Sequence, residues 1–236
     1  VQVHIETAGF GSIEQSVVER SMEDCYDYNI TTNFQLGRLL PEKVKLQMPF
    51  YYNYRKEVVK PLYNPLDTDM ELTESLDALA TEEERDSLRS LTMTKVTSRN
   101  LSFSNVKFNY QTMAKPMPWD PACFSLSYSH SHDHKEGQTT AWEDDYTWRG
   151  SFNYSYSPKF KAWEPFKKSK SKSKWFTIIK ELNFNYLPQS ITFDTDMNRT
   201  YYELQERDLD NRENMLALPL QWSQQWLWNR AFNLKW

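Results

Sequence analysis

The chain has 236 residues, of which 39% are hydrophobic, 25% charged and 15% aromatic, and its formal net charge is −4. No stretch approaches the roughly 20 apolar residues of a membrane-spanning helix, and the acidic balance gives no indication of nucleic-acid binding. The aromatic content is compatible with a transmembrane β-barrel, whose strands carry apolar residues only at every second position and whose aromatic side chains form girdles.

Before the first long strand, the sequence predicts a strand, a turn and a short helix, over Val1–Glu6, Gly9–Gly11 and Ser12–Glu19 respectively. Polar and apolar residues then alternate from Tyr26 to Leu36, and again from Lys43 to Arg55 after a brief turn. Two alternating runs joined by a short turn predict an antiparallel hairpin. Pro49 predicts a bulge or irregularity in the second strand, because proline cannot donate a ladder hydrogen bond.

Residues 57–99 differ from their surroundings and predict a long helical insertion between strands. The segment holds an acidic run, and Thr81 with Glu84 forms a capping box, which marks the start of a helix. A solvated helical loop is the simpler interpretation. A lid or a docking element is the alternative.

The remaining chain predicts further alternating strands. A shift of phase at Ser104–Asn105 indicates a bulge or turn. Further strands are expected at 101–110, 124–131, 148–156, 191–207 and 226–236, with a short alternating run at 182–186. The connections between them are expected to be a rigid connector at 115–121, a polar loop at 132–147, a basic loop at 157–174, a helical turn at 175–181 and a polar loop at 208–215. The total is roughly eight strands.

The two sides of these strands differ in a way that predicts lipid on one side and water on the other. A closed soluble barrel or sandwich would fill its inner face with Val, Ile and Leu, whereas here one side is aromatic and the other is rich in Asn, Ser, Thr and Asp. The residues predicted to face lipid are Tyr28, Ile30, Phe34, Leu46, Phe50, Tyr52, Phe152, Tyr154, Phe193, Trp226, Trp228, Phe232 and Leu234. The residues predicted to line a lumen are Asn29, Thr31, Asn33, Lys45, Gln47, Ser127, Arg149, Asn153, Asp194, Asp196, Asn198, Asn229 and Asn233. The predicted fold is therefore an all-β, antiparallel transmembrane β-barrel segment over residues 1–236, with a helical loop insertion over 57–99.

Several groups of residues could carry chemistry, and each has a simpler interpretation. His130, His132 and His134 would share one face of a strand, as metal ligands can, but they lead into a polar sequence and are assigned to a surface loop. The carboxylate pairs Asp194–Asp196 and Glu143–Asp145 could act as acid and base, but are interpreted as charges on a hydrated wall. The basic run over 167–174 is interpreted as a solvated loop that could dock a periplasmic partner. Cys25 and Cys123 could form one disulfide or none. No catalytic, metal or cofactor site is predicted.

Several stretches resemble one family: the SprA/Sov outer-membrane translocon of the type IX secretion system of Bacteroidota. The stretches, in the order of the family, are GFGSIEQ (9–15), LGRLLPEKVKLQMPFYYNY (36–54), YNPLDTD (63–69), SRNLSFSNVKFN (98–109), KPMPWDPACFSLSYS (115–129), EPFKK (164–168), LNFNYLPQSITFDTDMNRTYYELQERDL (182–209) and WNRAFNLKW (228–236). Two stretches look like departures from the family: the histidine-rich SHSHDHKEG and the lysine–serine run. Because proteins of this family are many times longer, the resemblance predicts that the chain is a fragment, cut at both ends.

The resemblance implies a function and a set of partners. The chain would form part of the wall of a very large barrel that passes folded proteins to the cell surface, in surface-protein secretion and gliding motility, without enzymatic activity. Its partners would be secreted cargo with a C-terminal signal, a lipoprotein-like shuttle barrel (PorV-like), a periplasmic plug protein and the lipid bilayer of the outer membrane. An outer-membrane barrel enzyme or a surface adhesin is the alternative, and a catalytic group at the rim of the loops would favour the enzyme.

Overall fold

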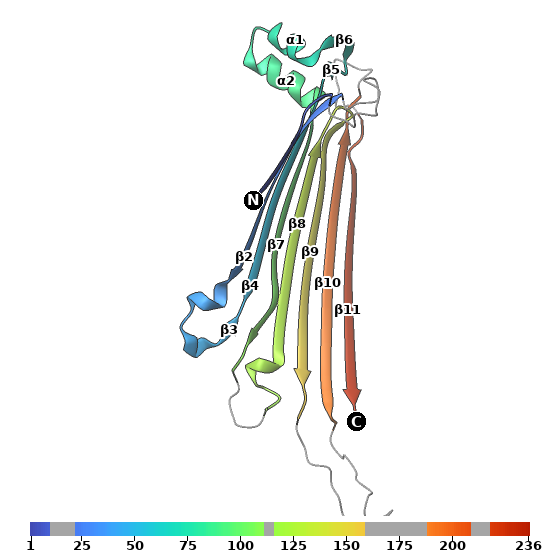
Figure 1. Cartoon of the computed structure of the whole chain (residues 1–236). Coiled ribbons are helices and arrows are strands. Elements are labelled where there is room, and N and C mark those ends of the chain that lie inside the picture. Colours follow the sequence, from blue (N-terminus) through green and yellow to red (C-terminus); the bar gives the residue numbers. More distant parts are fainter. Residues whose placement is uncertain (10–21, 111–115, 159–187, 209–217) are drawn as a thin grey trace, which may run out of the picture.

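The computed structural model describes residues 1–9, 22–110, 116–158, 188–208 and 218–236. Its dominant feature is one sheet of long strands (Figure 1). In spatial order these are β1 (Gln2–Glu6), β2 (Glu23–Gln35), β4 (Pro49–Pro61), β7 (Thr94–Phe108), β8 (Phe124–Glu136), β9 (Thr140–Tyr156), β10 (Ser190–Glu206) and β11 (Gln221–Lys235). The eight strands of this path agree with the roughly eight that the alternation predicts.

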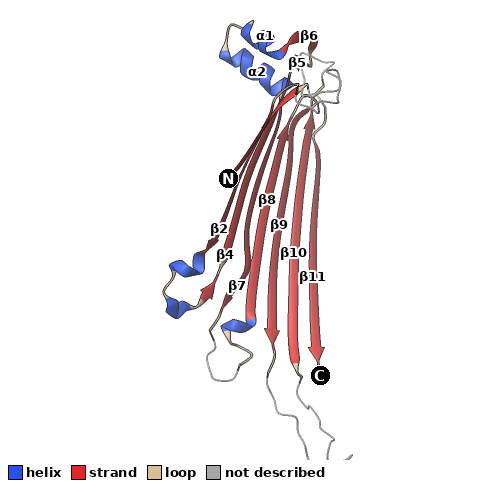
Figure 2. Cartoon of the chain, viewed as in Figure 1, coloured by secondary structure: helices blue, strands red, loops and turns tan. Residues whose placement is uncertain are grey.

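Every strand pair in the sheet is antiparallel, and the spatial order follows the order along the chain. The sheet is a single layer with the N-terminus at one edge and the C-terminus at the other, and the helices lie at its ends and cover neither face (Figure 2). Few described hydrophobic side chains are buried, among them Leu72 and Leu76 of the helical segment. The sheet thus has no hydrophobic core of its own. No helix among the described residues is long and apolar enough to cross a membrane.

The connection between β2 and β4 differs from the predicted turn and strand. Instead of a strand that starts at Lys43, the chain forms 3₁₀ turns at Leu36–Leu39 and Glu42–Val44, and then β3 (Leu46–Gln47), which pairs with β7. Lys45 has a positive φ of 46°, which ends the second turn and breaks the alternation. Gly37 fits tightly here, since a Cβ on it would clash with the carbonyl oxygen of Leu46. The interruption predicted at Pro49 is present, because Pro49 is the first residue of β4.

The helical insertion is present but narrower than 57–99. β4 continues to Pro61, which pairs with Glu23 of β2, and β7 begins at Thr94, which pairs with Val59 of β4. Between them lie β5 (Tyr63–Asn64), β6 (Asp67–Glu71), α1 (Leu72–Asp77) and α2 (Glu82–Thr92). The predicted capping box is confirmed: the Thr81 hydroxyl accepts a hydrogen bond from the Glu84 amide, and the Glu84 carboxylate accepts one from the Thr81 amide.

The histidine-rich segment is strand and not loop, which corrects the prediction. β8 runs on to Glu136, and β9 already begins at Thr140. The turn at 137–139 is closed by a hydrogen bond from the Gly137 amide to the Thr140 carbonyl at 2.9 Å. Polar side chains occupy both faces of these strand ends, so the alternation that marks a strand in sequence is lost there although the pairing continues.

The irregularity predicted at Ser104–Asn105 is confirmed. The register of β7 against β8 shifts between Phe103 and Val106, and Asn105 adopts a positive φ of 50°. The 3₁₀ turn at Pro121–Cys123 follows before β8. Other predicted elements lie wholly or mostly outside the described residues: the turn at 9–11, the helix at 12–19, the basic loop at 157–174, the helical turn at 175–181, the alternating run at 182–186 and the polar loop at 208–215.

Candidate functional site

One face of the main sheet gathers aromatic side chains from neighbouring strands. Strand pairing places Phe34, Phe50, Phe103 and Tyr128 side by side on β2, β4, β7 and β8, and the same face continues to Phe193 on β10. We call this the aromatic face. It holds every residue predicted to face lipid: Tyr28, Ile30, Phe34, Leu46, Phe50, Tyr52, Phe152, Tyr154, Phe193, Trp226, Trp228, Phe232 and Leu234. What covers this face stays a prediction.

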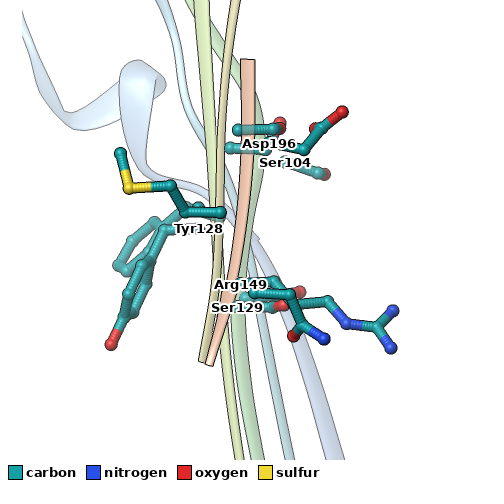
Figure 3. Close-up of a pocket in the computed structure, with 12 residues that line it drawn as sticks. Ser104, Tyr128, Ser129, Arg149 and Asp196 are labelled. Carbon is teal, nitrogen blue, oxygen red and sulfur yellow. The ribbon is translucent and has the colours of Figure 1, made fainter. Parts of the chain in front are cut away.

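The opposite face, which we call the polar face, gathers small and polar side chains. Near Gly150 the two faces can be seen together: Tyr128 extends from one side of the ribbons, whereas Ser104, Arg149 and Asp196 extend from the other (Figure 3). The polar face holds the residues predicted to line a lumen, except one: Asn29, Thr31, Asn33, Gln47, Ser127, Arg149, Asn153, Asp194, Asp196, Asn198, Asn229 and Asn233. The exception is Lys45, which lies in the β2–β4 connection.

The polar face is held together by contacts between its own side chains. Asn153 donates a hydrogen bond to the carboxylate of Asp194 on the neighbouring strand. The Arg55 guanidinium donates to Asp27 from two nitrogens, at 3.0–3.2 Å, and also pairs with Glu57. These polar groups thus find hydrogen-bond partners on the face itself.

The carboxylate pairs considered as acid and base lie on the polar face, and one member of each pair is engaged in such contacts. Glu143 accepts a hydrogen bond from the Tyr202 hydroxyl at 3.0 Å and lies 3.5 Å from the Lys135 amine. Partial burial and this hydrogen bond raise the pKa of Tyr202. Asp194 is bound by Asn153, so Asp194 and Glu143 link neighbouring strands of the sheet.

The aromatic face changes character toward the end of the sheet where α1 and α2 lie, which we call the helical end. Around Phe152 and Phe193 it is mainly apolar, and the one charged side chain that the structure describes there, Arg230 of β11, has its guanidinium carbon 4.1 Å from the ring centroid of Trp228. Nearer the helical end it carries Arg99, Asp144 and Glu203. The apolar part of β9, from Trp148 to Tyr156, is about the 9–11 residues that a tilted strand needs to cross a bilayer.

The apolar part is strongly exposed on the last strand. Phe232 of β11 is 65% exposed, and Trp226 is 60% exposed. Contiguous exposed apolar surface of this kind marks a membrane or protein contact in natural proteins. β11 is the last strand of the described sheet and every one of its residues is exposed, so this exposure also reflects the open sheet edge.

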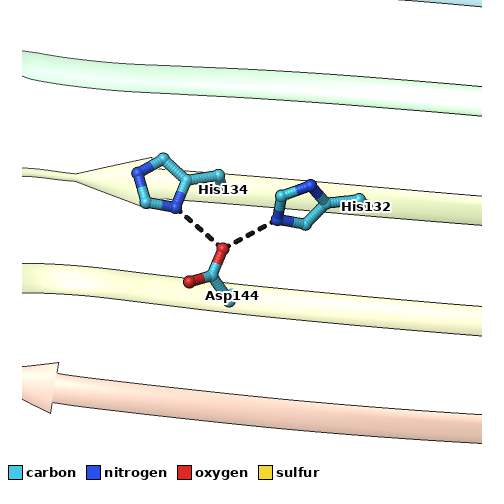
Figure 4. Close-up of side chains that lie close together, drawn as sticks. All are labelled: His132, His134 and Asp144. Atoms are coloured by element: carbon cyan, nitrogen blue, oxygen red, sulfur yellow. Dashed lines mark hydrogen bonds and ion pairs between the residues drawn. The ribbon is translucent and has the colours of Figure 1, made fainter.

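A histidine–carboxylate cluster lies on the aromatic face at the helical end. His132 Nε2 and His134 Nδ1 each lie 2.8 Å from the same oxygen of Asp144, Oδ1 (Figure 4). The other ring nitrogen of His134, Nε2, lies 3.1 Å from Glu136 Oε1. The sequence shows the two histidines on one face of a strand, but it gives no sign of Asp144, which reaches them only through the pairing of β8 with β9.

The cluster changes the proton affinity of its members. Partial burial lowers the pKa of His134, but hydrogen bonds to Asp144 and Glu136 outweigh it, and the net pKa is raised. Partial burial raises the pKa of Asp144, but the two imidazoles lower it further, and the net pKa is below its usual value. His130, the third histidine of the motif, stacks instead on Trp148, with ring centroids 5.3 Å apart.

Both cysteines are free. Cys25 lies on β2 near the helical end, and Cys123 is buried in the 3₁₀ turn before β8 at the opposite end. Of the two possibilities that the sequence leaves open, the structure has the one without a disulfide.

Comparison with known proteins gives one family match. Residues 1–76 match the family SprA_N, described as "motility related/secretion protein". No curated protein matches the chain. The matched residues include β1, β2 and β4, which are continuous with the rest of the main sheet through the pairing of β4 with β7. Over these residues, about a third of the chain, the protein is similar to the SprA family of motility-related and secretion proteins.

Proposed function

We propose that the chain is a wall segment of a protein-conducting outer-membrane channel, which exports folded proteins to the cell surface in type IX secretion. One observation carries the proposal: a single-layer antiparallel sheet with one aromatic and one polar face along its whole width. The similarity of residues 1–76 to a family of motility-related and secretion proteins supports a role in secretion. The mechanism is physical and needs no covalent chemistry from this chain.

In this proposal the aromatic face contacts lipid. The apolar part of β9 and β10, from Trp148 to Tyr156 and from Ile191 to Arg199, spans a band of about 25 Å, as in outer-membrane barrels. Trp148 and Tyr146 lie toward the helical end of this band, where amphipathic rings occupy the membrane interface. The charged residues nearer the helical end then lie outside the bilayer.

The polar face lines the lumen. Its Asn, Ser, Thr and Asp side chains bind water and one another, so they offer a passing folded protein little apolar surface to adhere to. Closure of the wall requires further strands beside β1 and β11, because an open sheet edge is not tolerated in lipid. Secreted cargo with a C-terminal signal, a lipoprotein-like shuttle barrel and a periplasmic plug are the partners that the family resemblance adds.

Cysteine accessibility tests the assignment of the faces. In the full-length protein with Cys25 and Cys123 replaced by serine, Asp194→Cys and Phe193→Cys are compared in intact outer membranes. These neighbours lie on opposite faces of one strand. We expect a small, water-soluble maleimide to label Asp194→Cys and leave Phe193→Cys unlabelled. Equal labelling of both would overturn the membrane assignment.

A second experiment tests the channel itself. Asn198→Cys on the polar face is labelled with a bulky maleimide, and surface delivery of cargo is measured; Met197→Cys on the aromatic face is the matched control. We expect export to fall only for labelled Asn198→Cys. Normal export after complete labelling would contradict a role of this face in conduction.

A further inference from the structure

We propose that His132, His134 and Asp144 form a binding site for a divalent cation of the zinc class, on the aromatic face of the β8–β9 hairpin. The three side chains offer two imidazole nitrogens and one carboxylate oxygen, all within 4.8 Å of one another. Two imidazoles and a carboxylate are a frequent ligand set of Zn²⁺. The site is independent of the lumen, since it lies on the aromatic face.

The distances suit a small cation. A tetrahedral zinc ion with ligand bonds of about 2.0–2.1 Å holds its ligand atoms roughly 3.3 Å apart. Both nitrogens now lie 2.8 Å from Asp144 Oδ1, so a small outward movement of the carboxylate would admit the ion. His134 lies directly opposite Asp144 in the strand pairing and His132 is the diagonal neighbour, so rigid backbone sets all three positions.

The ring of His132 is oriented in advance. It stacks on Tyr146 with a centroid distance of 4.1 Å and an interplanar angle of 6°. Tyr146 in turn stacks on Trp148, 5.6 Å away at 8°. This stack fixes the plane of the imidazole with Nε2 toward Asp144, so little rotamer freedom is lost when a cation binds.

Glu136 supplies the outer contact that metal-bound histidines usually have. His134 presents Nδ1 to the site, while its Nε2 lies 3.1 Å from Glu136 Oε1. A carboxylate that accepts a hydrogen bond from the Nε2–H group fixes the tautomer and makes the ligand nitrogen more basic. With neutral imidazoles, Asp144 and Glu136 contribute two negative charges, which match a divalent cation.

The cation would link β8 to β9 close to their tight turn and leave one coordination position for water. His134 has an exposed side-chain fraction of 30%, so the ion can enter from solvent. Arg99, which pairs with His132 from β7, has its guanidinium carbon 5.9 Å from the ring centroid of Tyr54, on the side away from Asp144.

Metal titration of the full-length protein, purified in detergent and stripped with a chelator, tests the site. Zn²⁺ is titrated against a chromophoric competitor, and Co²⁺ serves as a spectroscopic probe of the ligands. We expect His134→Ala and Asp144→Asn to weaken affinity at least about 100-fold and to abolish the visible Co²⁺ bands. Glu136→Gln should weaken affinity about 10–100-fold.

His130→Ala is the matched control, because His130 lies on the same strand and face but outside the ligand cluster. It should retain wild-type affinity. Circular dichroism of each variant separates loss of the site from loss of the fold. Absence of binding that depends on His134 and Asp144, in variants that remain folded, would overturn the proposal.

Discussion

The guanidinium carbon of Arg199 lies 5.4 Å from the ring centroid of Trp148, its partner across the β9–β10 pair. Arg199 interrupts the aromatic face of β10 between Met197 and Tyr201. The structure places it at the border between the apolar part of the aromatic face and the charged helical end. There, a cation over an aromatic ring with access to water costs little.

A charge placed deeper in the apolar part of the same face should destabilise the protein in the membrane. Phe152→Arg lies in the apolar part of the aromatic face, where an arginine at the bilayer midplane costs about 2–4 kcal/mol. We expect a loss of that order in unfolding from lipid vesicles and less assembled protein in the membrane. The control is Ser151→Arg, on the polar face of the same strand, which should change both measurements little. Similar losses for both would contradict the assignment of the faces.

Gly37 and Gly150 should respond in opposite ways to substitution by alanine. A Cβ on Gly37 would meet the Leu46 carbonyl oxygen, so Gly37→Ala should destabilise the β2–β4 connection by about 1–3 kcal/mol. A Cβ on Gly150 meets nothing within 4 Å, so Gly150→Ala should be neutral or slightly stabilising. Denaturant unfolding and hydrogen exchange of residues 36–48 provide the measurements. A Gly37→Ala variant as stable as Gly150→Ala would show that the loop relaxes freely.

Loss of the capping box should destabilise α2 locally. Thr81→Ala removes the hydroxyl that accepts from the Glu84 amide, and such losses cost about 0.5–2 kcal/mol. We expect faster hydrogen exchange over Glu82–Thr92, with no change in the strands of the main sheet. Thr81→Ser keeps the acceptor and should restore protection. If Thr81→Ser exchanged as fast as Thr81→Ala, a cause other than the cap would be indicated.

The contact of Tyr202 with Glu143, at the helical end of the polar face, should stabilise the fold in a pH-dependent way. Burial and the hydrogen bond to Glu143 raise its pKa above the ordinary value of 10.0. A pKa raised in the folded state means that the contact stabilises the fold fully below about pH 10 and is lost as pH rises through the folded pKa. The difference in tyrosinate absorbance between wild type and Tyr202→Phe should therefore titrate above pH 10. Glu143→Gln should move this titration to lower pH, and an unchanged midpoint would contradict the coupling.

The strands and their faces could be predicted from the sequence because alternation with period two depends on local residues alone. Residues such as Phe193 and Asp194 fall on opposite faces whatever their neighbours are. The structure departs from the prediction where strands pair although their residues do not alternate, or where the pairing joins segments that are distant in sequence. β8 and β9 continue to Glu136 and from Thr140 with polar residues on both faces, and β3 pairs with β7, which is distant in sequence.

Only part of the histidine–carboxylate cluster could be predicted from the sequence, for the same reason. His132 and His134 are neighbours on a face, so their proximity follows from the sequence once a strand is assumed. Asp144 joins them through the register of β8 against β9, which is set by the turn at 137–139. A sequence pattern contains no direct record of that register.

The agreement between spatial order and chain order has a consequence for how the sheet forms. Each long strand pairs with the long strands before and after it, so none has to insert between two that are already joined. The β8–β9 hairpin closes across three turn residues, 137–139, which gives it the smallest loop-closure entropy among the described pairs of long strands. We expect the sheet to nucleate there and to grow strand by strand toward both edges. Pulsed hydrogen exchange during refolding would then protect the amides of Phe124–Tyr156 first.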